Sequence, residues 1–376
     1  MIRPFRAPTR VLMAPGALSQ LPGIVAGYSP ERVLMVTDPG IEETEWPERI
    51  WRALAESEIE AITFDDVEPN PRASTVDRLA EWGKEEGATL VLGVGGGSVL
   101  DAAKAAAMAM TNEGPVAGFE GRDRSTEKSL PFIAVPTTCG TGSEVTWVSV
   151  LTVEERHAKI SVKGETMFPD WAIVDADLLS TLPGRLVAWT GVDALTHAVE
   201  ATTCRLANPV SDALAATAVS LLFRYLRRAA ADIAGDAEAR EGVMRASTLA
   251  GLAFGNADVA AVHCLSETLG GRYDLPHGLA NALLLAPVTR YNLPASAGKL
   301  ATLETALPPG SSAGAEGVVQ AIEDLLRDLG IPRFRDLGLP ASDHLWIADR
   351  AAKNGSIASN PREMGPEQYM ELLSSL

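Results

Sequence analysis

The sequence predicts an α/β domain built on a parallel sheet, followed by an all-helical domain. In the first half of the chain, short apolar runs alternate with helical patterns, as in a parallel sheet covered by helices on both faces. After about Pro183 the β-branched runs become rare, and residues 185–292 consist mainly of Ala- and Leu-rich stretches with helical spacing. The 376 residues are enough for two hydrophobic cores. We therefore expect domains at residues 1–183 and 184–376.

Four short apolar runs predict the strands of the first domain. They occupy residues 32–38, 61–64, 89–94 and 132–136. A helical pattern over residues 74–86 lies between the second and the third run. Ligands of such a sheet bind beside the carboxyl ends of its strands. The long helical stretches of the second domain cover residues 190–203, 211–231 and 237–269.

Composition and charge indicate which partners to expect. Apolar residues make up 46% of the chain and charged residues 22%, which is ordinary for a globular protein. The formal net charge of −17 argues against nucleic acid and anionic membranes as main partners. An anionic cofactor must therefore be bound by local geometry rather than by a general positive field.

The cysteines and the apolar runs predict a cytoplasmic protein. Cys139, Cys204 and Cys264 form an odd, widely spaced set that does not suggest a disulfide framework, so a reducing compartment is expected. No apolar run approaches the ~18 residues that a membrane-spanning helix requires.

Three of the five histidines suggest a metal site in the second domain. Asp193 and His197 are four residues apart, so on a helix they share one face and can bind one ion. His263 and His277 could complete a site of three imidazoles and one carboxylate, a ligand set that suits Fe(II) or Zn(II) better than calcium or magnesium. His277 follows Asp274 and Pro276, which are typical of a helix start. The alternative is that His197 and His263 are ordinary helix residues with hydrogen-bonded rings.

A glycine-rich turn suggests a phosphate site in the first domain. Gly95-Gly96-Gly97-Ser98 follows a predicted strand and opens a predicted helix over residues 99–110. Glycines let the backbone approach a phosphate, and the free N–H groups of a helix start then face the anion. The turn is neither the G-x-G-x-x-G fingerprint nor a P-loop, so a turn that serves only tight packing remains the alternative.

Two further strand ends carry polar residues that suit a nucleotide. Residues 136–144, including Thr137 and Thr138, bunch hydroxyl groups and glycines after the fourth strand; the alternative is a cap for a following helix. Asp38 ends the first predicted strand, where an acidic side chain can bind a ribose 2′-hydroxyl and repel a 2′-phosphate. This favours NAD(H) over NADP(H), unless Asp38 is a plain turn residue.

Together these motifs resemble the iron-containing (group III) alcohol dehydrogenases. The matching segments are residues 95–101 with Lys104, 136–146, 191–200 and 276–281, and the similarity covers nearly the whole chain. The resemblance implies a dinucleotide-binding α/β domain, a helical metal-binding domain and an active site in the cleft between them. It also implies that Asp193, His197, His263 and His277 are the metal ligands, holding Fe(II) or Zn(II).

The resemblance also assigns a set of cofactor residues. Lys159 matches a lysine that reaches the ribose of the cofactor, and Phe254 falls where the family places a wall of the substrate pocket. The positions that match cofactor-binding ones are Asp38, Asn70, Gly96, Gly97, Ser98, Asp101, Thr137, Thr138, Thr146, Lys159 and Leu179.

One position departs from the family pattern. Members commonly carry a second histidine four residues after the third ligand, and here that residue is Glu267. On a helix Glu267 shares a face with His263, so it should point into the active site. We expect it to act as a general base, to bind a hydroxyl or amine of the substrate, or to disfavour substrates with a carboxylate. The alternative is that it turns away and pairs with Arg272.

The resemblance implies a metal-dependent enzyme that moves a hydride between NAD(H) and a small alcohol, diol, aldehyde or ketone. Trp147, Val148 and Phe254 suggest a partly apolar substrate pocket. One alternative is an NAD- and metal-dependent cyclase of the dehydroquinate synthase type, which needs a basic pocket; another is a non-catalytic nucleotide- or metal-binding relative. Relatives are usually dimers or larger, so a homodimer or higher homo-oligomer is expected.

Overall fold

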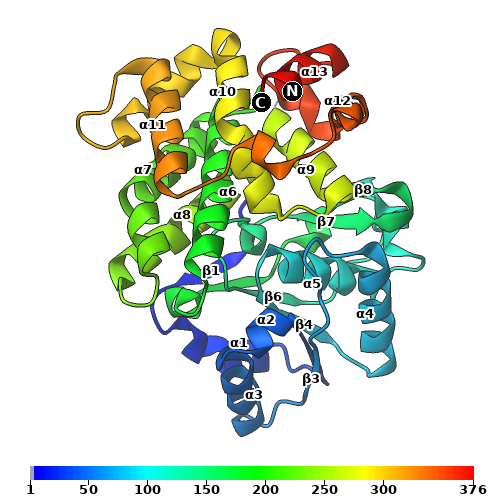
Figure 1. Ribbon diagram of the computed structural model, residues 1–376. Coiled ribbons are helices and arrows are strands. Elements are labelled where there is room, and N and C mark those ends of the chain that lie inside the picture. Colours follow the sequence, from blue (N-terminus) through cyan, green and yellow to red (C-terminus); the bar gives the residue numbers. More distant parts are fainter. Residues whose placement is uncertain (1–3) are drawn as a thin grey trace. The chain divides into compact units, whose positions relative to one another are not determined.

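The computed structural model describes residues 4–376, which fold into two compact units (Figure 1). The first unit, here called the sheet unit, comprises Ala7–Thr138 and Gly142–Leu182. The second, the helical unit, contains the described start of the chain through Arg6, the short run Cys139–Thr141, and Pro183–Leu376.

The sheet unit is built on a six-stranded parallel sheet, which confirms the predicted fold class. Its strands, in order across the sheet, are β1 (Arg10–Met13), β9 (Trp171–Val174), β6 (Phe132–Pro136), β4 (Leu90–Gly95), β2 (Val33–Val36) and β3 (Ala61–Phe64). All four predicted strands are present. The chain passes from β2 to β3 on one side and then returns to β4 on the other side of β2. The topological switch point therefore lies between β2 and β4, where sheets of this type bind ligands.

Helices cover both faces of this sheet because its strands are apolar on both sides. Leu34 and Val36 of β2 belong to a core shared with α4 (Ala73–Glu85) and α5 (Gly97–Ala109). Their neighbours Val33 and Met35 belong to the opposite core. That core includes residues of α1 (Leu21–Ala26) and α3 (Trp46–Glu56).

A small second sheet shares a hydrophobic core with α5. The strands β7 (Val148–Val153) and β8 (Ala158–Lys163) form an antiparallel hairpin, and β5 (Gly121–Arg122) pairs with β8. The sequence analysis did not predict this hairpin.

Lys104 of α5 connects the helix to the chain that leads into this hairpin. Its side chain is buried, and its ammonium donates to the Ser143 carbonyl (2.9 Å), the Ser143 hydroxyl (2.8 Å) and the Val148 carbonyl (2.8 Å). Asp101 lies 4.0 Å away. Burial outweighs the carboxylates of Asp101 and Glu144 and lowers the pKa of Lys104 to about 8.

This buried charge predicts a pH-dependent stability. Because the pKa of Lys104 falls from 10.5 to about 8 on folding, the unfolded chain holds more protons than the native protein between these values. The free energy of unfolding should therefore gain about 3 kcal/mol from this group as pH rises from 8 to 10.5. Urea unfolding of wild type and Lys104→Met over this range isolates the effect, because other titrating groups are common to both. Parallel stability curves would contradict the lowered pKa of Lys104 in the native protein.

The helical unit contains eight α-helices among its described residues. They are α6 (Gly184–Thr203), α7 (Pro209–Ala231), α8 (Ala237–Asn256), α9 (Ala261–Tyr273), α10 (His277–Ala301), α11 (Gly314–Asp328), α12 (His344–Ala351) and α13 (Pro366–Ser375). The start of the chain joins this unit through two hydrogen bonds with the end of α8. The Arg6 amide donates to Asn256 Oδ1 (2.5 Å), and Asn256 Nδ2 donates to the Arg6 carbonyl (2.8 Å).

One predicted helix is wrong. The stretch 237–269 is not a single helix, because α8 and α9 meet at an angle of 104°. The break at residues 257–260 has extended or irregular backbone, and side chains from elsewhere in the fold bind the amides that begin α9. Tertiary contacts thus override the helical spacing. Among the described residues no single helix is long and apolar enough to cross a membrane, although the bent pair α8 and α9 together passes that test by length and composition.

Candidate metal centre and nucleotide-binding loops

Four predicted ligand residues lie together inside the helical unit. Asp193 and His197 come from α6, His263 from the first turn of α9, and His277 from the first residue of α10. Their ligand atoms all lie within 4.8 Å of one another. The first three side chains are buried and His277 is half-buried. The spacing argument could link only Asp193 to His197; the fold brings the other two histidines to them.

The geometry of the cluster fits a divalent ion. Nε2 of His197 lies 3.0 Å from Nε2 of His263, and Oδ1 of Asp193 lies 3.7 Å from Nε2 of His277. Ligands placed tetrahedrally at about 2.1 Å from an ion are roughly 3.4 Å apart, so these separations bracket the required value. Three imidazoles and one carboxylate are a donor set for Fe(II) or Zn(II).

Asn281, which the sequence analysis did not select, shows that lone pairs converge here. Its Nδ2 lies 2.6 Å from Asp193 Oδ1, 3.2 Å from His263 Nε2 and 3.2 Å from His277 Nε2. An amide has only two N–H groups, so it cannot satisfy three acceptors at once. A cation can. The signal for Asn281 was its position four residues after His277, the same spacing that relates Asp193 to His197.

The protonation of the cluster also suits a cation. Burial lowers the pKa of His197 to about 4, so its ring is neutral and keeps a free lone pair at neutral pH. Burial opposes ionisation of Asp193, but the three histidines and the Asn281 amide outweigh it and lower the pKa of this carboxyl. The Asp193 side chain is therefore a carboxylate at neutral pH.

Glu200 is a second residue that the sequence analysis did not select as functional. It lies on α6 and its Oε2 is 2.6 Å from Nδ1 of His263. Burial opposes a charge on His263, but the hydrogen bond to Glu200 and the charge of that carboxylate raise the pKa of the imidazole. The signal in the sequence was spacing, since Glu200 lies three residues after His197 and so shares its helix face.

The two residues predicted on the substrate side lie in the same unit. The Phe254 ring stacks on His197 with centroids 4.2 Å apart and an interplanar angle of 16°. Glu267 is half-buried and accepts a hydrogen bond from Asn354 Nδ2 (2.6 Å). Arg272 pairs with Asp343 (3.3 Å) rather than with Glu267, so the alternative partner considered for Glu267 is not observed.

In the sheet unit, three predicted cofactor residues follow three neighbouring strands. Asp38 follows β2, Gly96 follows β4 and Thr137 follows β6, and these strands pair in the order β6-β4-β2. All three residues therefore lie at the carboxyl edge of the sheet, around the switch point.

The glycine turn packs closely against the Thr138 side chain, which fits the packing alternative. Gly96 is the N-cap of α5, and a Cβ atom added there would lie 2.9 Å from Thr138 Cγ2. Such close approach requires glycine. The first N–H groups of α5 have no partner within the helix, which makes its start a natural site for a phosphate.

Asp38 has two roles to reconcile. Its Oδ1 accepts from the amides of Gly40 (2.8 Å) and Ile41 (3.0 Å), so it caps the short helix α2 (Pro39–Glu42). Burial raises the pKa of this carboxyl despite the two amide donors. The cap occupies one carboxylate oxygen, so the turn role proposed as the alternative is real and does not exclude a ribose contact.

The remaining predicted cofactor residues also lie in the sheet unit, and several of them form hydrogen bonds with one another or with nearby residues. Lys159 of β8 donates to Asn70 Oδ1 (2.7 Å). Asp101 accepts from the Ser143 hydroxyl (2.6 Å) and the Val150 amide (2.9 Å), so both its oxygens are engaged by protein. The others lie at Gly97 and Ser98 in the first turn of α5, Thr146 after the 3-10 turn Ser143–Val145, and Leu179 in the 3-10 helix Ala176–Leu179.

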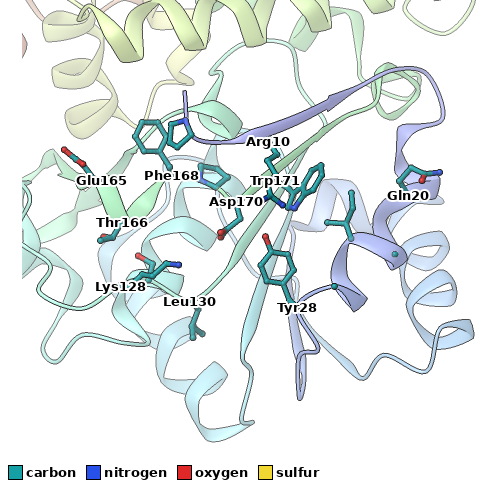
Figure 2. Close-up of a pocket in the computed structure, with 16 residues that line it drawn as sticks. Arg10, Gln20, Tyr28, Lys128, Leu130, Glu165, Thr166, Phe168, Asp170 and Trp171 are labelled. Atoms are coloured by element: carbon teal, nitrogen blue, oxygen red, sulfur yellow. The ribbon is translucent and has the colours of Figure 1, made fainter. Parts of the chain in front are cut away.

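A cavity of about 770 Å³ lies at the amino ends of strands of the same sheet, opposite the carboxyl ends that carry the nucleotide loops (Figure 2). Its lining includes Arg10 and Trp171, the first residues of β1 and β9, together with Tyr28 and Asp170. The guanidinium of Arg10 lies over the Trp171 ring at 5.4 Å. None of the predicted site residues lines this cavity, which therefore belongs to the amino edge and not to the nucleotide loops.

Comparison with known proteins covers nearly the whole chain. Residues 8–176 match the family described as iron-containing alcohol dehydrogenase, and residues 187–376 match the C-terminal part of the Fe-containing alcohol dehydrogenase family. A 1,3-propanediol dehydrogenase of Klebsiella pneumoniae is 41% identical over 347 residues, covering 90% of this chain and 89% of that protein.

Two solved structures show the same fold. The crystal structure of a 1,3-propanediol oxidoreductase has a TM-score of 0.94 at 38% identity and covers 99% of this chain and 100% of its own. The sulfoacetaldehyde reductase of Bifidobacterium kashiwanohense, solved in complex with NAD+, has a TM-score of 0.90 at 30% identity and covers 100% of this chain and 99% of its own.

Proposed function

Because the chain belongs to the iron-containing alcohol dehydrogenase family and is an oxidoreductase of alcohols and aldehydes, we propose that it moves a hydride between NAD(H) and a small alcohol or diol at an Fe(II) centre. The observation that carries this proposal is the cluster of Asp193, His197, His263 and His277. The dehydroquinate synthase-type cyclase is not favoured, because the similar proteins are alcohol and propanediol dehydrogenases.

In this proposal each unit has one task. Asp193 and the three histidines hold the divalent ion, which acts as a Lewis acid on the substrate oxygen when bound. Phe254 covers one face of His197 and offers apolar contact to the carbon chain of a substrate. The first turn of α5 binds the pyrophosphate of the cofactor through its free amides. We accordingly assign cofactor binding to residues 1–183 and metal binding to residues 184–376.

The direct test is anaerobic NADH oxidation by protein loaded separately with Fe(II) or Zn(II). Propanal, 3-hydroxypropanal and a matching ketone series serve as substrates. Turnover with Fe(II) supports the proposal, and turnover with Zn(II) alone would replace iron by zinc. If NADH and metal both bind but no carbonyl compound is reduced, the protein is a non-catalytic relative and the proposal is wrong.

The proposed preference for NAD(H) depends on the charge of Asp38. In Asp38→Asn the side-chain oxygen can still cap α2, but the negative charge that repels a 2′-phosphate is gone. We expect the ratio of kcat/KM for NADPH over NADH to rise by about tenfold or more. Glu42→Gln, an exposed acid in the same turn, is the control and should change this ratio by less than about twofold. An unchanged ratio in Asp38→Asn would assign the residue to the cap alone.

We propose that Glu267 accepts a hydrogen bond from the second hydroxyl of a diol. It lies close enough to His263 to influence the charge of that ring, and Asn354 holds its carboxylate. In Glu267→Gln, kcat/KM for 1,3-propanediol should fall by about tenfold, because the uncharged amide oxygen is a weaker acceptor than the carboxylate, while 1-propanol is affected far less.

The control for this variant is Asp343→Asn, which makes the same change at a carboxylate bonded to Tyr273 and Arg272. It should leave both alcohols unaffected. An equal loss for both alcohols in Glu267→Gln, with a changed pH profile of turnover, would instead assign Glu267 to proton transfer. An amino alcohol in the panel tests whether the carboxylate prefers a cation.

Two further proposals concern the whole molecule. We propose a homodimer, since β1 is an edge strand and exposes Val11 and Met13, which are 38% and 36% exposed. Light scattering measures the mass directly. We also propose a cytoplasmic location, in line with Cys139, Cys204 and Cys264, which are all free and buried.

A further inference from the structure

We propose that Glu200 is a positioning residue that fixes the ring of His263 for metal binding and ties the start of α9 to α6. The inference rests on the proposed metal site, although part of its test does not. Glu200 is not among the four residues whose ligand atoms converge. It acts on the site only through His263.

The carboxylate of Glu200 is buried and fully engaged by one short segment. Its Oε2 accepts from the Ala260 amide (2.9 Å) and lies 2.6 Å from His263 Nδ1, and its Oε1 accepts from the Val262 amide (2.8 Å). The residue is 3% exposed. All three partners lie at the start of α9, so one side chain holds both the backbone and the imidazole of this turn.

The start of α9 depends on such external partners. Its N-cap residue is Ala260, whose side chain cannot accept a hydrogen bond. Glu200 binds two of the first amides, and Asn360 Oδ1 accepts from a third, that of Ala261 (3.3 Å). A negative charge is also favourable at a helix N-terminus, because the partial positive charge of the helix lies there. The place of Glu200 is therefore fixed by the fold.

The contact with Nδ1 determines which nitrogen of His263 faces the cluster. When Nδ1–H donates to Glu200, Nε2 of the neutral ring carries the lone pair. Nε2 is the atom that lies 3.0 Å from His197 Nε2 and 3.2 Å from Asn281 Nδ2. Glu200 thus selects the tautomer that can bind an ion and holds the ring in that orientation, as outer carboxylates do for histidine ligands generally.

Glu200 also completes a single helix face. Asp193, His197 and Glu200 follow one another at spacings of four and three residues on α6. The same helix therefore supplies two ligands and the group that orients a third. Displacement of α9 relative to α6 would change all of these distances together.

The test compares Glu200→Gln with Asn360→Ala. The glutamine keeps the size of the side chain but cannot serve all three donors. Asn360→Ala removes the other external partner of α9 without touching His263. We expect Glu200→Gln to weaken Zn(II) and Fe(II) binding by about 10- to 100-fold in chelator competition. Asn360→Ala should lower the melting temperature of the metal-free protein but change metal affinity by much less.

A second readout needs no metal. In protein with ¹⁵N-labelled histidine, the nitrogen shifts of His263 in alkaline solution should report the Nδ1–H tautomer in wild type and a mixture in Glu200→Gln. This readout tests Glu200 even if the wild-type protein binds no divalent ion. Such a result would contradict the proposed function but not the positioning role of Glu200. An unchanged tautomer in Glu200→Gln, or a loss of metal affinity no larger than in Asn360→Ala, would overturn the positioning role.

Discussion

Replacing His197 with alanine is expected to remove most divalent-metal binding and, with it, hydride transfer. Nε2 of His197 lies 3.0 Å from Nε2 of His263, and the His197 ring is neutral at pH 7 because burial lowers its pKa to about 4. A four-ligand site binds zinc with roughly 10–16 kcal/mol, so the loss of one ligand should weaken binding by about 100- to 1000-fold. Metal content after dialysis and single-turnover NADH oxidation measure the two effects.

The variant also removes the ring on which Phe254 stacks, so packing must be separated from ligation. Phe254→Leu alters the same contact and leaves all four ligands in place. It should retain metal and change mainly the KM for the alcohol. His344→Ala, a histidine at the start of α12, controls for the substitution itself. Stoichiometric metal in His197→Ala would show that the cluster is not the site.

Substituting Gly278 with alanine should disable the site without changing any ligand. A Cβ atom at Gly278 would lie 2.6 Å from the Trp189 carbonyl oxygen and 2.9 Å from its carbonyl carbon. Both are backbone atoms of α6, so the first turn of α10 must move away from α6. His277 precedes Gly278, and Asp193 lies one turn beyond Trp189. The 3.7 Å distance between His277 Nε2 and Asp193 Oδ1 would therefore increase. A displacement approaching 1 Å costs about 100-fold in turnover.

The same helix offers a matched control at its other end. Gly298 also lies in α10, and an added Cβ there meets nothing within 4 Å. Gly298→Ala should be neutral or up to about 1 kcal/mol more stable, because alanine is the better helix former. If Gly278→Ala retains metal affinity and turnover, α10 can yield at its start, and the close packing against α6 is not required.

The central strands of the sheet could be predicted because they are buried on both faces. β2, β4 and β6 appear in the sequence as continuous apolar runs. β1 and β9 were missed, although β2 and β3 are equally short and were predicted. β1 carries an exposed arginine and two other exposed positions, which breaks the apolar pattern. The bend between α8 and α9 was missed for a different reason, since the side chains that begin α9 come from distant parts of the chain.

The candidate site could likewise be predicted only where the pattern is local in the sequence. The link between Asp193 and His197 follows from helix periodicity alone, and the nucleotide loops follow from strand ends. Glu200 shares the α6 face with these ligands, but its partners are 60 or more residues away in sequence. No local pattern shows that its carboxylate serves His263 and not solvent. The role of Asn281 likewise depends on three acceptors that only the tertiary fold collects.

The way in which the chain divides between its units has a consequence for biosynthesis. The sheet unit is complete once Leu182 has left the ribosome, but the helical unit includes Arg6, whose partner Asn256 lies 250 residues further on. At bacterial and eukaryotic elongation speeds, roughly 10–50 s separate the emergence of these two residues. During that interval the two hydrogen bonds between Arg6 and Asn256 cannot form, and the cluster of ligands cannot assemble before His277 is translated.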